Sequence, residues 1–247
     1  LAPLQSSDSE EIARKKINAV ARYIEIFSVR RSINYRKFGA SSIRYTMFTL
    51  VKELRRLNLD QLNEKLRSRL NEMEETWDGM AQFGLHGQNR NFVKFLLSRI
   101  TAFIEQSAKH PTYFSTYHAR QGSNQFEVEH IWADKFTEHQ DEFEQQHEFD
   151  TARNLIGDLV LLPQGTNQSY GAKPYAEKYE HYVKENLLVK SLNEKAYENN
   201  PNFLNMTTEL DLPFKAHSTY KKADIDERQS LYQKICERIW SVDGFDE

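Results

Sequence analysis

FEVEHIW, residues 126–132, and RNLIGDLVLLPQGTNQSYGAKPYAEK, residues 153–178, are the two stretches that decide the predicted fold. In the first, apolar and acidic residues alternate, which predicts a short strand that ends at Glu129 and His130. In the second, the apolar run 159–162 lies between a glycine and a proline and predicts another strand. We therefore expect these two strands to form a small sheet.

A turn and a helix are predicted after the second strand. The turn-forming sequence GTNQSYG places Asn167 in a turn, and Pro174 suits the first turn of a helix that runs to about Leu188 and carries Lys178. An isolated Glu–His pair means little, because most single histidines are surface or satisfied core residues. The whole order strand–His–strand–Asn–helix is more specific, and it resembles the HNH, or ββα-metal, nucleases.

The other parts of the chain have helical patterns. Four apolar stripes at helical spacing predict a bundle whose core they form. The stripes are Ile17, Val20, Ile24 and Phe27; Ile43, Met47, Leu50 and Leu54; Leu62, Leu66, Leu70, Met73 and Trp77; and Phe92, Leu96, Ile100 and Phe103. Ser7 with Glu10 predicts the cap of the first helix, and Asp224 with Glu227 predicts the start of the last.

The fold class that we expect is mostly α, with a small α+β (ββα-metal, HNH-like) nuclease unit. Three domains are predicted. Residues 1–120 form a helical bundle or connector, residues 121–190 form the ββα unit, and residues 191–247 form an extension whose closing helix packs on the helical part.

Composition limits the class of protein. The 247 residues are 39% hydrophobic and 28% charged, which suits a folded core. The sequence has no run of 18 apolar residues and no signal-peptide pattern, so we expect no membrane partner and a cytoplasmic location. Cys236 is the only cysteine, which excludes an intrachain disulfide and a zinc–thiolate site, and we expect it to be a buried thiol. The start without Met indicates a fragment or a processed chain.

Phosphodiester hydrolysis requires an activated water, neutralisation of phosphate charge and help for the leaving oxygen. We expect His130 to be the general base, because a neutral imidazole accepts a proton near pH 7. Oxygen donors at Glu129, Asp158 and Asn167 suit a divalent cation, Mg²⁺ or Mn²⁺. These side chains are expected to converge on one concave site. Lys173 and Lys178 are expected to hold neighbouring phosphates of the DNA.

The motif region is also similar to the C-terminal HNH-type nuclease domain of GmrSD-like and SspE-like modification-dependent anti-phage restriction proteins. The matching text is EHIWAD, IGDLVLL, GTNQSY and PYAEK, and the segment 23–54 is similar to the helical connector that precedes that domain. Two positions depart from the family pattern. Ala133 replaces the usual Pro, and Asp158 occupies a usual Asn position, so either Asp158 or Asn154 fills the middle catalytic position.

The resemblance implies a function. It implies a metal-dependent endonuclease domain that nicks double-stranded phage or plasmid DNA in a bacterial restriction system, with an N-terminal NTPase-like sensor domain as partner. Catalysis would then involve His130, Asn154 and Asn167. The alternative is a catalytically inactive HNH fold that binds DNA or a protein, which the aspartate at position 158 would favour. A purely helical interaction domain with a chance motif is a third possibility.

Charge distribution adds a possible DNA contact. Residues 1–120 hold 20 Lys and Arg against 12 Asp and Glu, whereas residues 121–247 hold 13 against 24. Such asymmetry is typical of a basic binding surface beside an acidic one, and also of solvated faces that meet at a domain interface. The cationic cluster Arg30, Arg31, Arg36 and Lys37 is expected to contact the DNA backbone or the preceding domain, with an ordinary solvated helix end as the alternative.

Overall fold

The structure, a computed structural model, describes residues 1–119 and 125–245. The chain divides into two compact units, which we treat separately. The first unit consists of Leu1–Gly79 with the segment from Trp240 onward, and the second consists of Met80–Ile239. The domain boundary that we predicted at 120–121 lies outside the described residues, so the three-domain division stays a prediction.

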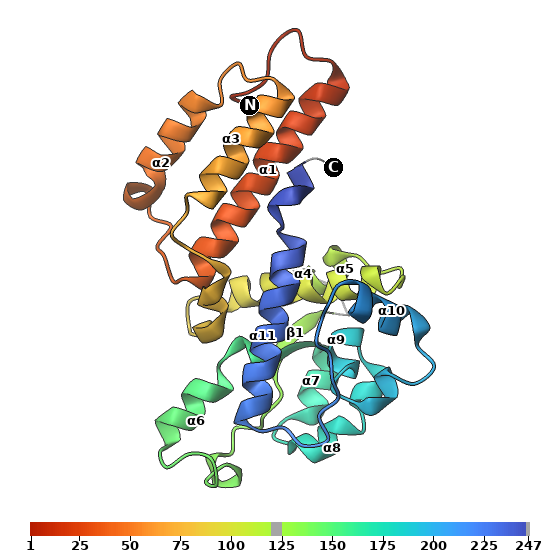
Figure 1. Cartoon of the computed structure of the whole chain (residues 1–247). Helices are drawn as coiled ribbons and strands as arrows, with labels where there is room; N and C mark the ends of the chain where they lie inside the picture. Colours follow the sequence, from red (N-terminus) through yellow and green to blue (C-terminus); the bar gives the residue numbers. More distant parts are fainter. Residues whose placement is uncertain (120–124, 246–247) are drawn as a thin grey trace. The chain divides into compact units, whose positions relative to one another are not determined.

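The first unit contains three long helices and a final 3-10 turn (Figure 1). Their bounds are Glu10–Ile33 for α1, Ala40–Glu53 for α2, Leu59–Asn71 for α3 and Val242–Phe245 for η6. The prediction that Ser7 caps the first helix is wrong, because the Ser9 side chain accepts the hydrogen bond from the Ile12 backbone N–H. The residue three positions after Ser9 is Ile12, so the true cap lacks the Ser–x–x–Glu pattern that favoured Ser7.

The buried face of α1 differs from the predicted stripe. Ile17 and Ile24 are exposed, at 47% and 49%, whereas Ala19, Tyr23 and Ile26 are buried. The stripe was offset by about one residue because a tyrosine and the long stem of a lysine contribute to the core in place of two isoleucines. That lysine, Lys16, is 1% exposed and its ammonium is paired with Asp8.

The second unit holds the sheet and the remaining helices (Figure 1). The α-helices are α4 (Arg90–Ser107), α5 (Phe114–His118), α6 (Gln146–Arg153), α7 (Gln164–Tyr170), α8 (Tyr175–Tyr179), α9 (Leu187–Lys190), α10 (Pro201–Glu209) and α11 (Lys222–Ile239). The 3-10 turns are η2 (Phe136–Glu138), η3 (Ile156–Asp158), η4 (Tyr182–Lys184) and η5 (Glu194–Ala196). One further turn, η1 (Trp77–Gln82), spans the junction in sequence between the units. Cys236 is buried in α11, as predicted.

Two antiparallel strands, β1 (Phe126–His130) and β2 (Leu159–Pro163), form the sheet. Glu127 faces Leu162 and Glu129 faces Val160 across the ladder. Because side chains alternate along a strand, these four side chains share one face of the sheet, while the side chain of His130 lies on the other face. Val160 and Leu162 belong to a buried cluster with Trp132, Phe149 and Tyr182.

The expectation of a mostly helical protein with a small two-stranded sheet is confirmed. The ββα-metal fold itself stays a prediction.

Two local predictions after β2 are wrong. Asn167 lies inside α7 and not in a turn, because burial of Tyr170 outweighs the weak helix propensity of this stretch. The helix that was expected from Pro174 to Leu188 is α8, only five residues long. Asn186 then caps a new helix by accepting from the Val189 N–H.

Candidate active site

His130 lies at the end of β1 and contacts Asn154, the residue that follows α6. Its Nε2 lies 3.2 Å from Oδ1 of Asn154. Asn154 donates its own Nδ2–H to the Asp150 carbonyl at 2.7 Å, so Oδ1 is the atom that faces the imidazole. An amide oxygen can only accept, so Nε2 carries the proton and Nδ1 carries the lone pair. Among the described residues, none bonds to Nδ1 of His130.

The surroundings of His130 keep its ring neutral. Burial lowers the pKa of His130 from 6.5 to about 3, and the positive charges of Arg153, Lys178 and Arg90 act in the same direction, against the bond from Asn154. Arg90 also donates to the backbone carbonyl of Val128 in β1, and Arg153 to that of Trp132 just after the strand. A neutral imidazole surrounded by cations suits a proton acceptor that operates next to an anion.

Glu129 and Lys178 form a buried ion pair on the other face of β1. The Lys178 ammonium donates to Oε1 of Glu129 at 2.6 Å and to the carbonyl of His130 at 2.9 Å. The Lys178 side chain is 1% exposed and that of Glu129 is 13% exposed. This ammonium therefore ties the carboxylate to the end of the strand. Lys178 was predicted to hold a phosphate, and its ammonium is instead bonded to these protein groups.

Asn167 of α7 meets a carboxylate that sequence reasoning missed. Its Nδ2 donates to Oε2 of Glu127 at 3.0 Å. Glu127 precedes Glu129 by two residues, so both carboxylates lie on the same face of β1. The alternation along the strand was the signal that could have identified Glu127. The three side chains supply hard oxygen donors of the kind that Mg²⁺ and Mn²⁺ prefer.

Asp158 has a different environment from the one expected of a metal ligand. It is fully buried, and both carboxylate oxygens accept from the Trp132 backbone N–H, at 3.1 and 3.3 Å. Burial raises the pKa of Asp158 well above its usual value, while the bond from Trp132 lowers it. Asp158 thus connects the turn before β2 to the segment after β1. The turn is tightly packed, since a Cβ on Gly157 would lie 2.2 Å from the Ile225 carbonyl oxygen of α11.

The predicted site residues therefore form two groups along β1. His130 and Asn154 make one group, and Asn167 with Glu127 and the pair Glu129–Lys178 make the other. The structure does not bring Asp158 into hydrogen-bond contact with either group. Lys173 is half-buried, with its ammonium 5.9 Å from the centre of the Tyr170 ring.

The two predicted DNA-binding arginines of the first unit have protein partners. Arg30 donates to the carbonyls of Leu70, Met73 and Glu75. Arg31 is paired with the Glu75 carboxylate at 3.1 Å. These bonds fix the end of α1 to the segment after α3, and the predicted DNA contact stays untested.

One other cluster offers metal-ligand atoms within the described ranges. His217, Asp224 and Glu227 have ligand atoms within 4.8 Å of one another. Both carboxylate oxygens of Asp224 already accept hydrogen bonds, from His217 and from the Lys221 backbone N–H. Nδ1 of His217 lies 2.8 Å from Asp224, and Glu227 is paired with Lys215. We therefore assign these residues to the anchoring of the segment before α11.

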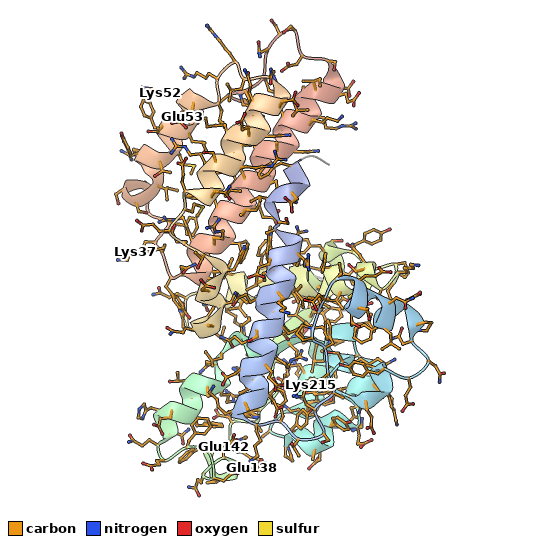
Figure 2. The ribbon with its side chains drawn as sticks, viewed as in Figure 1. Lys37, Lys52, Glu53, Glu138, Glu142 and Lys215 are labelled. Carbon is orange, nitrogen blue, oxygen red and sulfur yellow. The ribbon has the colours of Figure 1, made fainter. Side chains whose placement is uncertain are left out.

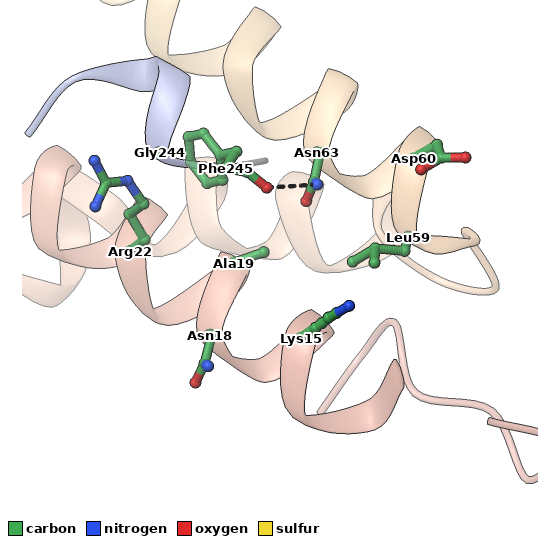
Figure 3. Close-up of a pocket in the computed structure, with 9 residues that line it drawn as sticks. All are labelled: Lys15, Asn18, Ala19, Arg22, Leu59, Asp60, Asn63, Gly244 and Phe245. Atoms are coloured by element: carbon green, nitrogen blue, oxygen red, sulfur yellow. Dashed lines mark hydrogen bonds between the residues drawn. The ribbon is translucent and has the colours of Figure 1, made fainter. Parts of the chain in front are cut away.

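A cavity of about 380 Å³ lies in the first unit (Figure 3). It is lined by α1, α3 and the η6 turn, and Asn63 of α3 donates to the Phe245 carbonyl at 2.7 Å at its edge. Lys15 and Arg22 also line it. None of the predicted catalytic or metal-binding residues does. The cavity therefore shares no lining residue with the candidate active site.

No helix in the described part of the chain has both the length and the hydrophobicity needed to cross a membrane.

Comparison with known proteins identifies the family. No curated protein and no solved structure matched the chain. The family model of GmrSD restriction endonucleases, C-terminal domain, matches residues 79–235, which is more than half of the chain and includes both groups of candidate residues. This match confirms the resemblance to the C-terminal domain of GmrSD-like restriction proteins and implies a nuclease domain that acts on DNA. The chain belongs to the GmrSD restriction endonuclease family through this C-terminal domain.

Proposed function

We propose that this chain is the metal-dependent nuclease part of a bacterial anti-phage restriction system, and that it nicks double-stranded DNA with His130 as general base. The observation that carries the proposal is the hydrogen bond between His130 and Asn154. It supports one tautomer, in which Nδ1 holds the lone pair. Substrate water would therefore lose its proton to Nδ1, while Asn154 keeps the ring in place.

The charge around His130 supports the same role. Arg153, Arg90 and Lys178 contribute to the lowered pKa of the imidazole, so the ring is neutral at the pH of the cell. A phosphate that enters beside these cations would compensate their charge and so raise the pKa of His130 in the complex. Proton affinity would then increase when the substrate is in place. A general base of this kind contributes about 10²–10⁴-fold to the rate.

Glu127, Glu129 and Asn167 fit a divalent cation. Two carboxylates on one face of β1 and an amide from α7 are a suitable donor set, and rotation of the amide about its last bond would present Oδ1 to the carboxylates. A cation held there would polarise the phosphate and stabilise the leaving alkoxide. Mg²⁺ retains several waters, so two or three protein ligands suffice. The pairing of Lys178 with Glu129 positions that carboxylate.

Aspartate at position 158 does not by itself favour the inactive alternative. Asp158 accepts a hydrogen bond from the Trp132 N–H, which an asparagine oxygen would also do. The structural role of position 158 is therefore compatible with either aspartate or asparagine. His130 and Asn154 would provide the polar groups next to the substrate. We further propose that a separate NTPase-like sensor domain controls this nuclease, as the family resemblance implies.

Metal dependence is tested by nicking of supercoiled plasmid with Mg²⁺, Mn²⁺ or EDTA. Glu127→Gln and Asn167→Ala should raise the Mg²⁺ concentration needed for half-maximal rate at least tenfold. The matched control Glu177→Gln, on an exposed position of α8, should leave it unchanged. Full activity in EDTA would refute the metal. Unchanged Mg²⁺ dependence in both variants would place the ion elsewhere.

A further inference from the structure

Helix α2 presents an outer surface that the nuclease site does not use. Leu50 is the only fully buried residue of this helix. Tyr45 and Phe48 are exposed at 80% and 55%, and Phe38, in the loop before the helix, is exposed at 44%. Large aromatic side chains are seldom left so accessible in neighbouring positions without a partner. The exposure therefore indicates a binding surface.

The same surface is strongly cationic. No acidic residue occurs in the sequence between Glu25 and Glu53. The exposed cations of the segment 36–56 are Arg36, Lys37, Arg44, Lys52, Arg55 and Arg56. Its one acid, Glu53, is already paired with Arg69 of α3. Lys37 and Lys52 extend outward from the ribbon (Figure 2). Among the described residues, Lys37, Arg44, Arg55 and Arg56 have no carboxylate partner within ion-pair distance.

Helical geometry places the cations and aromatics together. Arg44, Phe48 and Lys52 follow one another at intervals of four residues, so they form one stripe along α2, and Tyr45 lies beside it. The half-buried Ile43 and the buried Leu50 lie on the opposite side. The Lys52 ammonium is 4.3 Å from the centre of the Phe48 ring, so a cation and an aromatic face are in contact. We call Arg44, Tyr45, Phe48 and Lys52 the α2 stripe.

We propose that the α2 stripe binds unpaired, single-stranded DNA, with the cations on phosphates and the aromatic rings stacked on bases. The inference deepens the proposed function, on which it rests for the choice of DNA. The centre of a protein–protein interface is depleted in charge, whereas here every aromatic is next to a cation. Duplex DNA would occupy the cations and leave the rings unused, because its bases are already stacked. Alternating rings and cations are the pattern of single-strand binding surfaces.

The test measures binding without cleavage. Fluorescence anisotropy is followed for a labelled 20-nucleotide oligothymidine and for a duplex of equal length, in EDTA, over a range of salt concentrations. Without metal the assay does not depend on catalysis, so its failure and the failure of the nuclease proposal are distinguishable. The wild-type chain should bind the single strand more tightly than the duplex.

Two variants separate stacking from charge. Tyr45→Ala/Phe48→Ala should weaken single-strand binding about tenfold or more and leave the salt dependence unchanged. Arg44→Gln/Lys52→Gln should reduce the slope of log affinity against log salt by about 1.4, since each phosphate contact on a single strand contributes about 0.7. The matched controls are Ile17→Ala/Ile24→Ala, large apolar side chains that are also exposed on α1, and Lys234→Gln/Arg238→Gln on α11. Both should bind as the wild type does.

Three outcomes would overturn the proposal. The first is single-strand affinity within twofold of wild type in the aromatic variant, with circular dichroism unchanged. The second is tighter binding of the duplex than of the single strand. The third is no binding of either DNA at 50 mM salt, which would favour an acidic protein as the occupant. The substituted side chains are exposed, so loss of the fold is not expected to obscure the result.

Discussion

Replacement of Lys178 by methionine tests how the strand end is held. The change leaves the Glu129 carboxylate, 13% exposed, without the ammonium that lies 2.6 Å from it. Loss of one partner of a buried ion pair costs about 3–5 kcal/mol, because the remaining charge stays desolvated. The variant also removes a donor from the His130 carbonyl. For a chain of this size the free-energy change corresponds to a fall in melting temperature of about 10 °C.

The assay is a thermal melt followed by circular dichroism, with urea titration for the free energy of unfolding. Lys222→Met is the matched control, since Lys222 forms an exposed pair with Asp226 and should cost less than about 1 kcal/mol. In Lys178→Met/Glu129→Gln the uncompensated charge is absent, so the double variant should be more stable than Lys178→Met alone. A single variant within 1 kcal/mol of wild type would refute the structural role of this ion pair.

Three further predictions follow from the same region. Asp158→Asn should be more stable than the wild type at pH 8, because the raised native pKa of Asp158 means that stability falls as pH rises through that pKa. Asp158→Ala should lose about 1–3 kcal/mol of unfolding free energy in urea titration, since the Trp132 N–H loses its acceptor. His130 has a native pKa of about 3, below its unfolded value of 6.5, so its stabilising effect is present above pH 6.5 and lost as pH falls. Between pH 7.5 and 5.0 the wild type should lose about 2 kcal/mol more than His130→Gln in unfolding titrations, and equal losses would contradict burial of a neutral ring. Gly84→Ala should lower both nicking and melting temperature, because a Cβ would lie 2.4 Å from the Asn154 backbone oxygen; unchanged values would show that Asn154 tolerates displacement.

The sequence predicted the arrangement of secondary structure around the site better than the contacts within it. Both strands were predicted because alternation and a bounded apolar run are local signals. The phase of α1 was not, since Tyr23 and the stem of Lys16 bury surface that a scale of hydrophobic residues assigns to Ile17 and Ile24. Periodicity alone does not reveal which amphipathic side chain is paired inside a fold.

Roles at the site depended on partners far away in sequence. Asp158 was expected to bind metal because of its residue type, and its bond to Trp132 depends on a turn that packs against α11. Lys178 lies 49 residues from Glu129, so their pairing could not be inferred from spacing. Glu127 could have been identified from the sequence, because strand alternation from Glu129 already placed it on the same face of β1.

The rate of plasmid nicking by His130→Ala tests the central claim most directly. Single-turnover nicking is measured with Mg²⁺ at pH 7.5 for the wild type, for His130→Ala and for the control His147→Ala, whose histidine is exposed on α6. If Nδ1 of His130 removes the proton from water, the His130 variant should be slower by about 10²–10⁴-fold, with unchanged circular dichroism and with the control at the wild-type rate. A folded His130→Ala chain that nicks DNA within threefold of the wild-type rate would contradict the account.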